Sequence, residues 1–231
     1  MRRYLVVDDN AAFGENLAEI LRDTGAEAVV AESGARALEL VRRQRFDALV
    51  TDMRMPVMSG AQLVHEIRRV DPGLPAVVVT AYTGEDDLVA AREEGLLAVL
   101  PKPVPLKPLV ELLNAARRDG LVALVEDDAQ LADNLAEALR ERGFSAVMAH
   151  SVAETERLRG VAPFAALVDL RLPGGPDGQA LSALTRRFPK LPVLVVSAHP
   201  DAIARVPAAL PLFPKPFETG KLIDAVEKLW R

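Results

Sequence analysis

The chain has 231 residues, half of them hydrophobic but only 4% aromatic, and its formal net charge is −5. It contains no cysteine, which excludes disulfides, thiol catalysis and zinc–thiolate sites, and neither half carries the basic excess of a nucleic-acid-binding module. No stretch approaches the roughly 20 apolar residues that cross a bilayer, and the N-terminal apolar run is too short for a signal peptide. We therefore expect a cytoplasmic protein that binds neither nucleic acid nor membranes.

The first half of the chain predicts five strands separated by helical patterns. The expected strands are continuous apolar runs, at about 3–7, 26–30, 47–51, 76–80 and 97–100. Runs without polar alternation are typical of strands that are buried on both faces of a parallel sheet. After the first strand, apolar residues recur along one helix face at Phe13, Leu17, Ile20 and Leu21, and Gly25 follows as a stop. Further helices are expected at about 85–94 and 108–118.

The second half repeats the first. Four short motifs recur in the same order: LVVDDN and ALVEDD, DMRMP and DLRLP, PAVVVTA and PVLVVSA, LPKP and FPKP. Apolar spacing also predicts a helix on Leu131, Leu135, Ala138 and Leu139, stopped by Gly143. A repeat of this length indicates a duplicated domain, with copies at 1–119 and 120–231. The first strand of the second copy is expected to begin at Leu121, with no flexible tether before it, and the last helix is expected on Leu222, Val226 and Leu229.

Each copy is predicted to be an α/β domain with a doubly wound, five-stranded parallel sheet of the flavodoxin-like (βα)5 type. In such a sheet, ligands bind beyond the carboxyl ends of the strands. In the first copy these ends carry acidic, hydroxyl and basic side chains: Asp8, Asp9, Asp52, Thr80 and Lys102. Converging carboxylates repel one another, and a hard cation such as Mg²⁺ relieves that repulsion. The set suits phosphoryl transfer to a carboxylate.

These motifs resemble those of the receiver domain of two-component response regulators, over nearly the whole chain. The resemblance rests on an acidic pair, D-x-x-x-P, a Thr or Ser after the fourth strand and Lys-Pro after the fifth, each found twice. It implies that Asp52 and Asp169 are phosphoacceptors. The implied Mg²⁺ ligands in both copies are Asp8, Asp9, Asp52, the Arg54 carbonyl, Glu126, Asp127, Asp169 and the Arg171 carbonyl. The implied groups that hold the phosphoryl oxygens are Thr80, Lys102, Ser197 and Lys215.

The same resemblance implies cis peptides before Pro103 and Pro216 and a histidine kinase or phosphotransfer protein as phosphodonor. The chain would then signal through a downstream protein and not act as an enzyme. Two departures stand out. Helix four of the second copy should be short or absent, because Pro200, Pro207 and Pro211 interrupt it. Valine and leucine, Val99 and Leu212, replace the aromatic residue that receivers often carry before the lysine.

Several alternatives remain open. One copy is phosphorylated and the other is a structural or dimerising module, with a homodimer as a possible assembly. The chain is a segment of a larger signalling protein. A third alternative is a metal-dependent phosphohydrolase that uses an aspartyl phosphate. Of the histidines, His65 is expected on the surface of helix three, His199 beside the second pocket without a necessary role, and His150 has no assigned role.

Overall fold

The computed structural model describes the chain except for residues 82–94, 199–200, 202–206, 208 and 231, and the side chains of Arg157 and Arg159. The chain forms two compact units, Met1–Asp119 and Gly120–Arg231. Within the described residues, no helix combines the length and the apolar character that a membrane crossing requires. The predicted helix at 85–94 and most of the proline-interrupted segment that begins at His199 lie outside the described residues.

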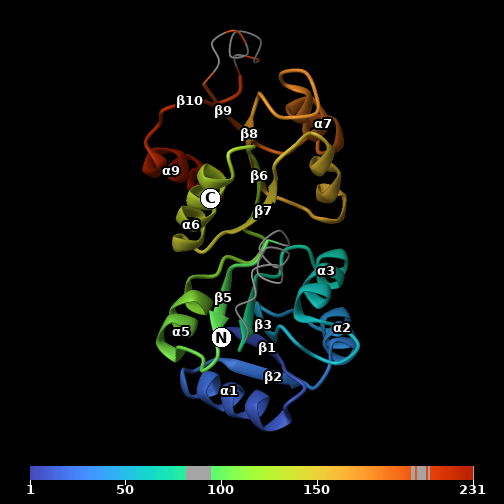
Figure 1. The fold of residues 1–231 in the computed structure, drawn as a ribbon. Coiled ribbons are helices and arrows are strands. Elements are labelled where there is room, and N and C mark those ends of the chain that lie inside the picture. The colour runs from blue at the N-terminus through green and yellow to red at the C-terminus, as the bar shows by residue number, and fades with distance from the viewer. Residues whose placement is uncertain (82–94, 199–200, 202–206, 208, 231) are drawn as a thin grey trace. The chain divides into compact units, whose positions relative to one another are not determined.

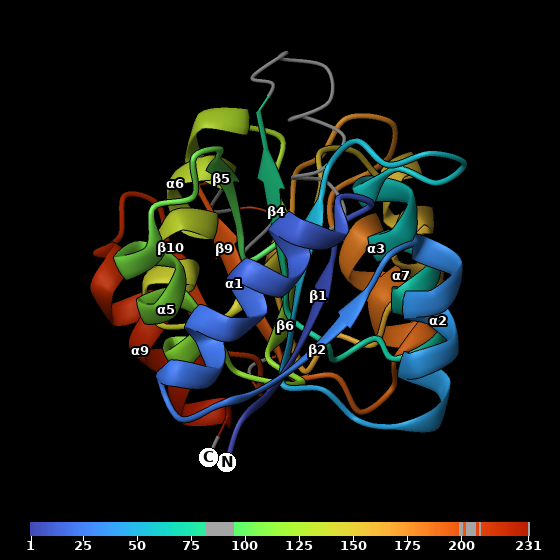
Figure 2. The ribbon, with the colours of Figure 1, turned by 90° about the horizontal axis from the view of Figure 1, so that it is seen from below.

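The first unit is a five-stranded parallel sheet in the order β2-β1-β3-β4-β5. Its strands are β1 (Arg3–Val7), β2 (Glu27–Ala31), β3 (Ala48–Asp52), β4 (Ala76–Thr80) and β5 (Ala98–Pro101). Its described helices are α1 (Ala11–Asp23), α2 (Gly34–Arg43), α3 (Gly60–Val70) and α5 (Leu106–Ala115). Helices α1 and α5 cover one face of the sheet and α2 and α3 the other (Figures 1 and 2). The strand predictions are confirmed to within one residue at each end.

The second unit repeats this architecture, with the sheet order β10-β9-β8-β6-β7. Its strands are β6 (Leu121–Val125), β7 (Ser145–Ala149), β8 (Ala165–Asp169), β9 (Val193–Ser197) and β10 (Leu212–Pro214). Its described helices are α6 (Ala129–Glu141), the 3₁₀ helix η1 (Ala153–Gly160), α7 (Gln179–Arg187) and α9 (Thr219–Trp230). A 3₁₀ helix thus takes the place that α2 has in the first unit. Both units have the flavodoxin-like fold expected from the sequence.

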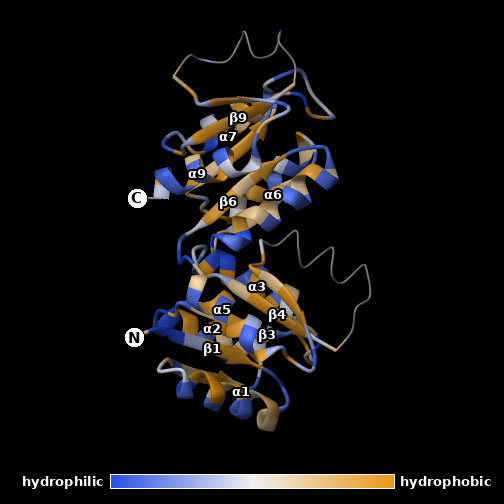
Figure 3. Ribbon diagram, turned by 90° about the vertical axis from the view of Figure 1, so that its left-hand side faces the viewer, coloured by the Kyte–Doolittle hydropathy of each residue, from blue (hydrophilic) through white to orange (hydrophobic). Residues whose placement is uncertain are grey.

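Each sheet separates two apolar cores. Along β1, Tyr4 and Val6 pack toward α1 and α5, whereas Leu5 and Val7 pack toward α2 and α3. Successive strand residues point to opposite faces, so both neighbours in the sequence must be apolar. This explains the continuous apolar runs, which Figure 3 shows as orange strands between helices with hydrophilic outer positions.

Helix α1 begins at an N-cap, as does its counterpart α6. The Asn10 side chain accepts a hydrogen bond from the Phe13 amide, and Asp128 accepts one from the Leu131 amide. Helix α9 differs from its prediction. Leu222 and Val226 are buried as expected, but Leu229 is 40% exposed. Its place in the core is taken by Trp230, whose ring contacts Phe144 and Phe164, because a bulky aromatic side chain at the helix end reaches the core from the next position.

The loop after β3 contains a strained residue. Val57, the fifth residue after Asp52, has a φ of 70° and a fully exposed side chain. This left-handed conformation is costly for a β-branched residue. At the matching position of the second unit, five residues after Asp169, stands Gly174, with a φ of 88°. Both loops therefore have a left-handed residue at this position, and only the second unit has a glycine there.

Replacing Val57 with glycine should stabilise the first unit by about 1 kcal/mol, since it removes strain of about 1–3 kcal/mol while adding flexibility to the unfolded chain. The exposed valine side chain loses no buried contact. Hydrogen exchange of β1 and β3 in the full chain measures the change. The converse substitution Gly174→Val should speed exchange in β6 and β8. Faster exchange in Val57→Gly than in the wild type would contradict the prediction.

Candidate phosphoacceptor sites

In the first unit, the carboxyl ends of four strands bring the predicted site residues to one edge of the sheet. Asp52 and Thr80 are the last residues of β3 and β4, Asp8 follows β1, and Lys102 follows β5. Asp8, Asp52 and Thr80 are buried. Asp9, the second member of the acidic pair, is exposed. The edge thus holds two carboxylates and a hydroxyl that are shielded from water, with a third carboxylate at the surface.

Lys102 neutralises the two buried carboxylates. Its Nζ lies 2.8 Å from Asp8 Oδ2 and 2.6 Å from Asp52 Oδ1. Burial alone would lower the pKa of Lys102, but the hydrogen bonds and charges of Asp52 and Asp8 outweigh it and raise the pKa above its usual value. The Phe13 ring lies 4.1 Å from the same Nζ, at cation–π distance. The lysine therefore stays charged throughout the neutral range.

The loop after Asp52 fixes the orientation of its carboxylate. The Arg54 amide donates to Asp52 Oδ2 at 2.6 Å, and the Gly60 amide donates to the Met53 carbonyl at 2.9 Å. A Cβ atom on Gly60 would lie 2.2 Å from the Asp52 carbonyl oxygen, so only glycine allows this close return of the chain. One carboxylate oxygen thus faces the lysine, and the other faces a backbone amide.

The second unit has the same arrangement, except that a glutamate, with its longer side chain, stands in the place of Asp8. Asp169 and Ser197 end β8 and β9, Glu126 follows β6, and Lys215 follows β10. Lys215 Nζ donates to both oxygens of Glu126, at 2.8 and 2.7 Å, and to Asp169 Oδ2 at 2.6 Å. Asp127 is exposed, as Asp9 is in the first unit. Glutamate in the place of Asp8 therefore holds its lysine through two oxygens, whereas Asp8 uses one.

Ionisation in this second site reflects burial and pairing together. Burial raises the pKa of Glu126, and the negative charge of Asp169 adds to this, while Lys215 acts in the opposite direction. Burial alone would lower the pKa of Lys215, but its hydrogen bonds to Asp169 and Glu126 raise it overall. The lysine remains protonated at neutral pH and compensates two carboxylates that are almost wholly buried.

The loop after Asp169 contains one more residue than its counterpart before the following glycine. The Arg171 amide donates to Asp169 Oδ1 at 3.0 Å, as Arg54 does to Asp52. The Gly178 amide donates to the Leu170 carbonyl at 2.6 Å, which matches the bond from Gly60 to Met53. The extra residue therefore lies before Gly178, and both hydrogen bonds around the aspartate are kept.

The two units differ in how closely their acidic groups approach. Within the described part of the chain, one group of three carboxylates has ligand atoms all within 4.8 Å of one another, and it consists of Glu126, Asp127 and Asp169. Clustered carboxylate oxygens are the donor set that Mg²⁺ prefers. The amides of Arg54 and Arg171 donate hydrogen bonds to Asp52 and Asp169. Peptide bonds Lys102–Pro103 and Lys215–Pro216 are both cis, as the resemblance implied.

Two contacts in these sites had no sequence signal strong enough to predict them. Phe13 reads as a core residue of α1, yet its ring lies against Lys102. His150 has no motif around it, yet its Nδ1 lies 2.8 Å from the Glu126 carbonyl oxygen. Both depend on which side chains the fold brings beside the strand ends. His65 is exposed on α3, as expected.

Comparison with known proteins identifies the family. The family model for the response regulator receiver domain matches residues 4–114. A response regulator receiver protein of Anaeromyxobacter sp. (strain Fw109-5) is 62% identical over 231 residues, which is 100% of this chain and 96% of that protein. The chain belongs to the response regulator receiver family. As a member of this family it acts in two-component signalling, as a phosphoacceptor and not as a classical enzyme.

Other relatives match half of this receiver protein. The transcriptional regulatory protein GlrR of Escherichia coli (strain K12) is 38% identical over 122 residues, 53% of this chain but only 28% of GlrR. Among solved structures, a response regulator receiver protein from Pseudomonas putida is 35% identical, with a TM-score of 0.48, and covers 49% of this chain and 95% of that one. Receiver domains typically bind Mg²⁺ and take their phosphoryl group from a histidine kinase.

Removing Lys215 should destabilise the second unit of this receiver protein. In Lys215→Met, two buried carboxylates face each other without a cation, and we expect a loss of about 2–4 kcal/mol at neutral pH. Burial and the charge of Asp169 raise the pKa of Glu126, and without Lys215 no cation opposes them, so the loss should shrink as the pH falls and Glu126 is protonated. Urea unfolding followed by Trp230 fluorescence measures it.

The control for this experiment is Glu126→Gln combined with Lys215→Met, which removes one charge of each sign. It should recover most of the lost stability. In the wild type, the raised pKa of Lys215 means that the charge of the lysine is lost only at alkaline pH, so a pH dependence of the loss on the acid side comes from the carboxylates. A loss in Lys215→Met that does not depend on pH would show that the carboxylates are not its cause.

Proposed function

We propose that this protein is a tandem receiver, with domains at 1–119 and 120–231, that accepts phosphoryl groups on Asp52 and Asp169 in the presence of Mg²⁺. One observation carries the proposal. In both units a lysine Nζ lies 2.6 Å from the aspartate that ends the third strand, and it also binds the first acidic residue of the acidic pair. A lysine in this place can move its donors from the carboxylate to a phosphoryl oxygen without leaving the site.

The proposed reaction is an in-line displacement at phosphorus. An Asp52 carboxylate oxygen forms the new P–O bond while the P–N bond of a phosphohistidine breaks, and the released imidazole takes a proton from solvent. The Arg54 amide, bound to the other carboxylate oxygen, keeps the attacking oxygen pointed outward. Lys102, and Thr80 at the end of β4, then hold the phosphoryl oxygens. Asp169, Ser197 and Lys215 would act in the same way in the second domain.

Mg²⁺ would be held by the acidic pair and the phosphoacceptor of each unit, with the carbonyls of Arg54 and Arg171 completing the set. The metal would offset the charge on the phosphoryl oxygens. The donor chemistry fits, because Glu126, Asp127 and Asp169 offer only oxygen ligands and converge. In the first unit, Asp8 and Asp52 are bound to Lys102, and exposed Asp9 would complete the site.

A second candidate is that only the first domain is phosphorylated and the second is a structural or dimerising partner. Two observations favour it. The family model matches only the first domain. The second lysine also binds both oxygens of Glu126, so a metal and a phosphoryl group must compete with three short contacts. The phosphodonor would be a histidine kinase or phosphotransfer protein, and the signal would pass to a downstream protein.

Phosphorylation by acetyl phosphate with Mg²⁺ distinguishes these candidates. Intact-mass analysis of the wild type should show up to two base-labile phosphoryl adducts, one in Asp52→Asn and in Asp169→Asn, and none in the double variant. A single adduct that only Asp52→Asn abolishes would support the second candidate. An adduct that survives in the double variant would refute both. Steady turnover of p-nitrophenyl phosphate would instead indicate a phosphohydrolase.

Metal binding tests the acidic pairs separately. Asp127→Ala should weaken Mg²⁺ binding to the second unit by about 10-fold or more, because it removes a charged ligand from the convergent cluster. Asp9→Ala should do the same for the first unit. Isothermal titration calorimetry measures both. The matched control is Asp133→Ala, an exposed carboxylate on α6 away from the cluster. Unchanged binding in Asp9→Ala and Asp127→Ala would refute the ligand assignment.

A further inference from the structure

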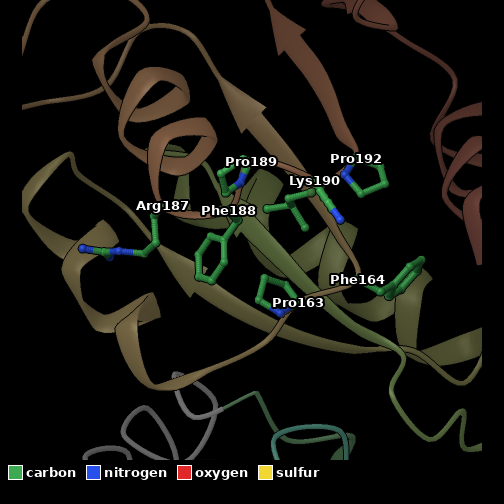
Figure 4. Close-up of a pocket in the computed structure, with 8 residues that line it drawn as sticks. Pro163, Phe164, Arg187, Phe188, Pro189, Lys190 and Pro192 are labelled. Atoms are coloured by element: carbon green, nitrogen blue, oxygen red, sulfur yellow. The ribbon is translucent and has the colours of Figure 1, made fainter.

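A pocket of about 550 Å³ lies at the amino edge of the second unit's sheet, opposite the edge that carries Asp169 and Lys215. Residues before β8 and between α7 and β9 line it, among them Pro163, Phe164, Phe188, Pro189, Lys190 and Pro192. Figure 4 shows the rings of Phe188 and Phe164 on either side of Pro163. The lining is mostly rings, with a single lysine among them.

The internal repeat places the same corner in the first unit. At the offset of 117 residues that relates Asp52 to Asp169 and Thr80 to Ser197, the pocket residues correspond to residues before β3 and between α3 and β4. Pro163 corresponds to Phe46, Phe164 to Asp47, Phe188 to Asp71 and Lys190 to Gly73. The two corners can therefore be compared position by position.

In the first unit, the chain itself fills this corner. Arg118 donates to the Phe46 carbonyl and pairs with Asp71 at 2.6 Å. The Asp119 amide donates to the Gly73 carbonyl at 2.7 Å, and the Asp119 carboxylate lies 3.6 Å from Arg45. A Cβ on Gly73 would collide with Asp119, so the glycine accommodates the bound segment. The counterparts of Pro163, Phe188 and Lys190 thus all contact the arginine–aspartate turn that follows α5.

In the second unit, the described chain takes another course. Helix α9 continues to Trp230, and its ring lies 5.0 Å from Phe164 and 5.8 Å from Phe144. These contacts cover the outer side of Phe164 and leave the corner between Phe188 and Pro192 open as the pocket. The second unit thus has a pocket at this corner, and none of the described residues fills it.

The side chains of this pocket also differ in charge and polarity from those at the matching corner of the first unit. The anion that binds arginine in the first unit, Asp71, is replaced by Phe188, and Lys190 introduces a cation where Gly73 stands. Lys190 is exposed and pairs with none of the described carboxylates. The other cation, Arg187, already pairs with Glu156 at 3.3 Å and points away from the rings (Figure 4). A segment that binds in this pocket must therefore place an apolar side chain against the rings and a carboxylate near Lys190.

We propose that this pocket binds a short segment of a partner protein in which an aromatic or aliphatic side chain is followed by an acidic residue. The segment would take the place that Arg118 and Asp119 have in the first unit, with the arginine replaced by an apolar residue. Burial of one such side chain among rings provides the affinity, and the charge of Lys190 selects the acidic neighbour. This binding does not depend on phosphorylation, because the site of Asp169 is at the opposite edge of the sheet.

The test uses the full chain and the fluorescence of Trp230, its one tryptophan, which contacts the pocket residue Phe164. The probes are capped tetrapeptides with the central pairs Phe-Asp, Phe-Asn and Arg-Asp. Phe-Asp should give a saturable change at about millimolar concentration. Phe-Asn should bind about 3-fold more weakly, which is the size expected of an exposed charge pair. Arg-Asp should bind more weakly than Phe-Asp.

Two variants make the result specific. Lys190→Gln should abolish the difference between Phe-Asp and Phe-Asn, whereas Lys221→Gln, an exposed lysine on α9, should preserve it. Phe188→Asp should reverse the preference toward Arg-Asp, as the first unit predicts. Equal binding of Phe-Asp and Arg-Asp by the wild type would overturn the proposal. So would a fluorescence change without amide shifts at Phe188 and Lys190 in NMR spectra.

Discussion

A partly buried lysine between two buried carboxylates is the interaction on which each site depends. Parallel strands end at one edge of the sheet, so this fold places the acidic residues after the first and third strands close together. Without a cation, two such carboxylates would repel each other in a poorly solvated place. Lys102 and Lys215 remove that repulsion and remain free to exchange a carboxylate for another anion. The stability of the site and the phosphoryl transfer that we propose for it thus depend on the same lysine.

The two copies of the domain preserve this interaction but differ around it. In the second unit, the glutamate that replaces Asp8 lets Lys215 bind two oxygens of one partner. In the first unit, the lysine also lies over an aromatic ring, that of Phe13. The amino edges of the sheets differ still more, since one corner is filled by its own chain and the other is an open pocket. Duplication has therefore given two similar carboxyl edges and two amino edges with different binding chemistry.

Most of the fold could be predicted because its physical cause is local. A strand that is buried on both faces must be apolar at every position, and the five runs of the first unit mark β1 to β5 to within one residue. The caps on Asn10 and Asp128 follow from adjacent residues in the same way. The 3₁₀ form of η1 and the exposure of Leu229 were not predicted. They depend on how a short segment and a helix end pack against the rest of the unit, and apolar spacing does not record such packing.

The sequence by itself determined which residues stand at the strand ends, and so which carboxylates, hydroxyls and lysines share an edge. It did so because strand order and polarity in this fold follow from the repeat of strands and helices. Only the tertiary structure decided how those groups pair, for instance that Glu126 offers two oxygens and Asp8 one. It also decided that Arg118 and Asp119 occupy a corner whose counterpart in the second unit is open. Pairing depends on side-chain length and on distances between segments far apart in the chain, and these are fixed only when the sheet assembles.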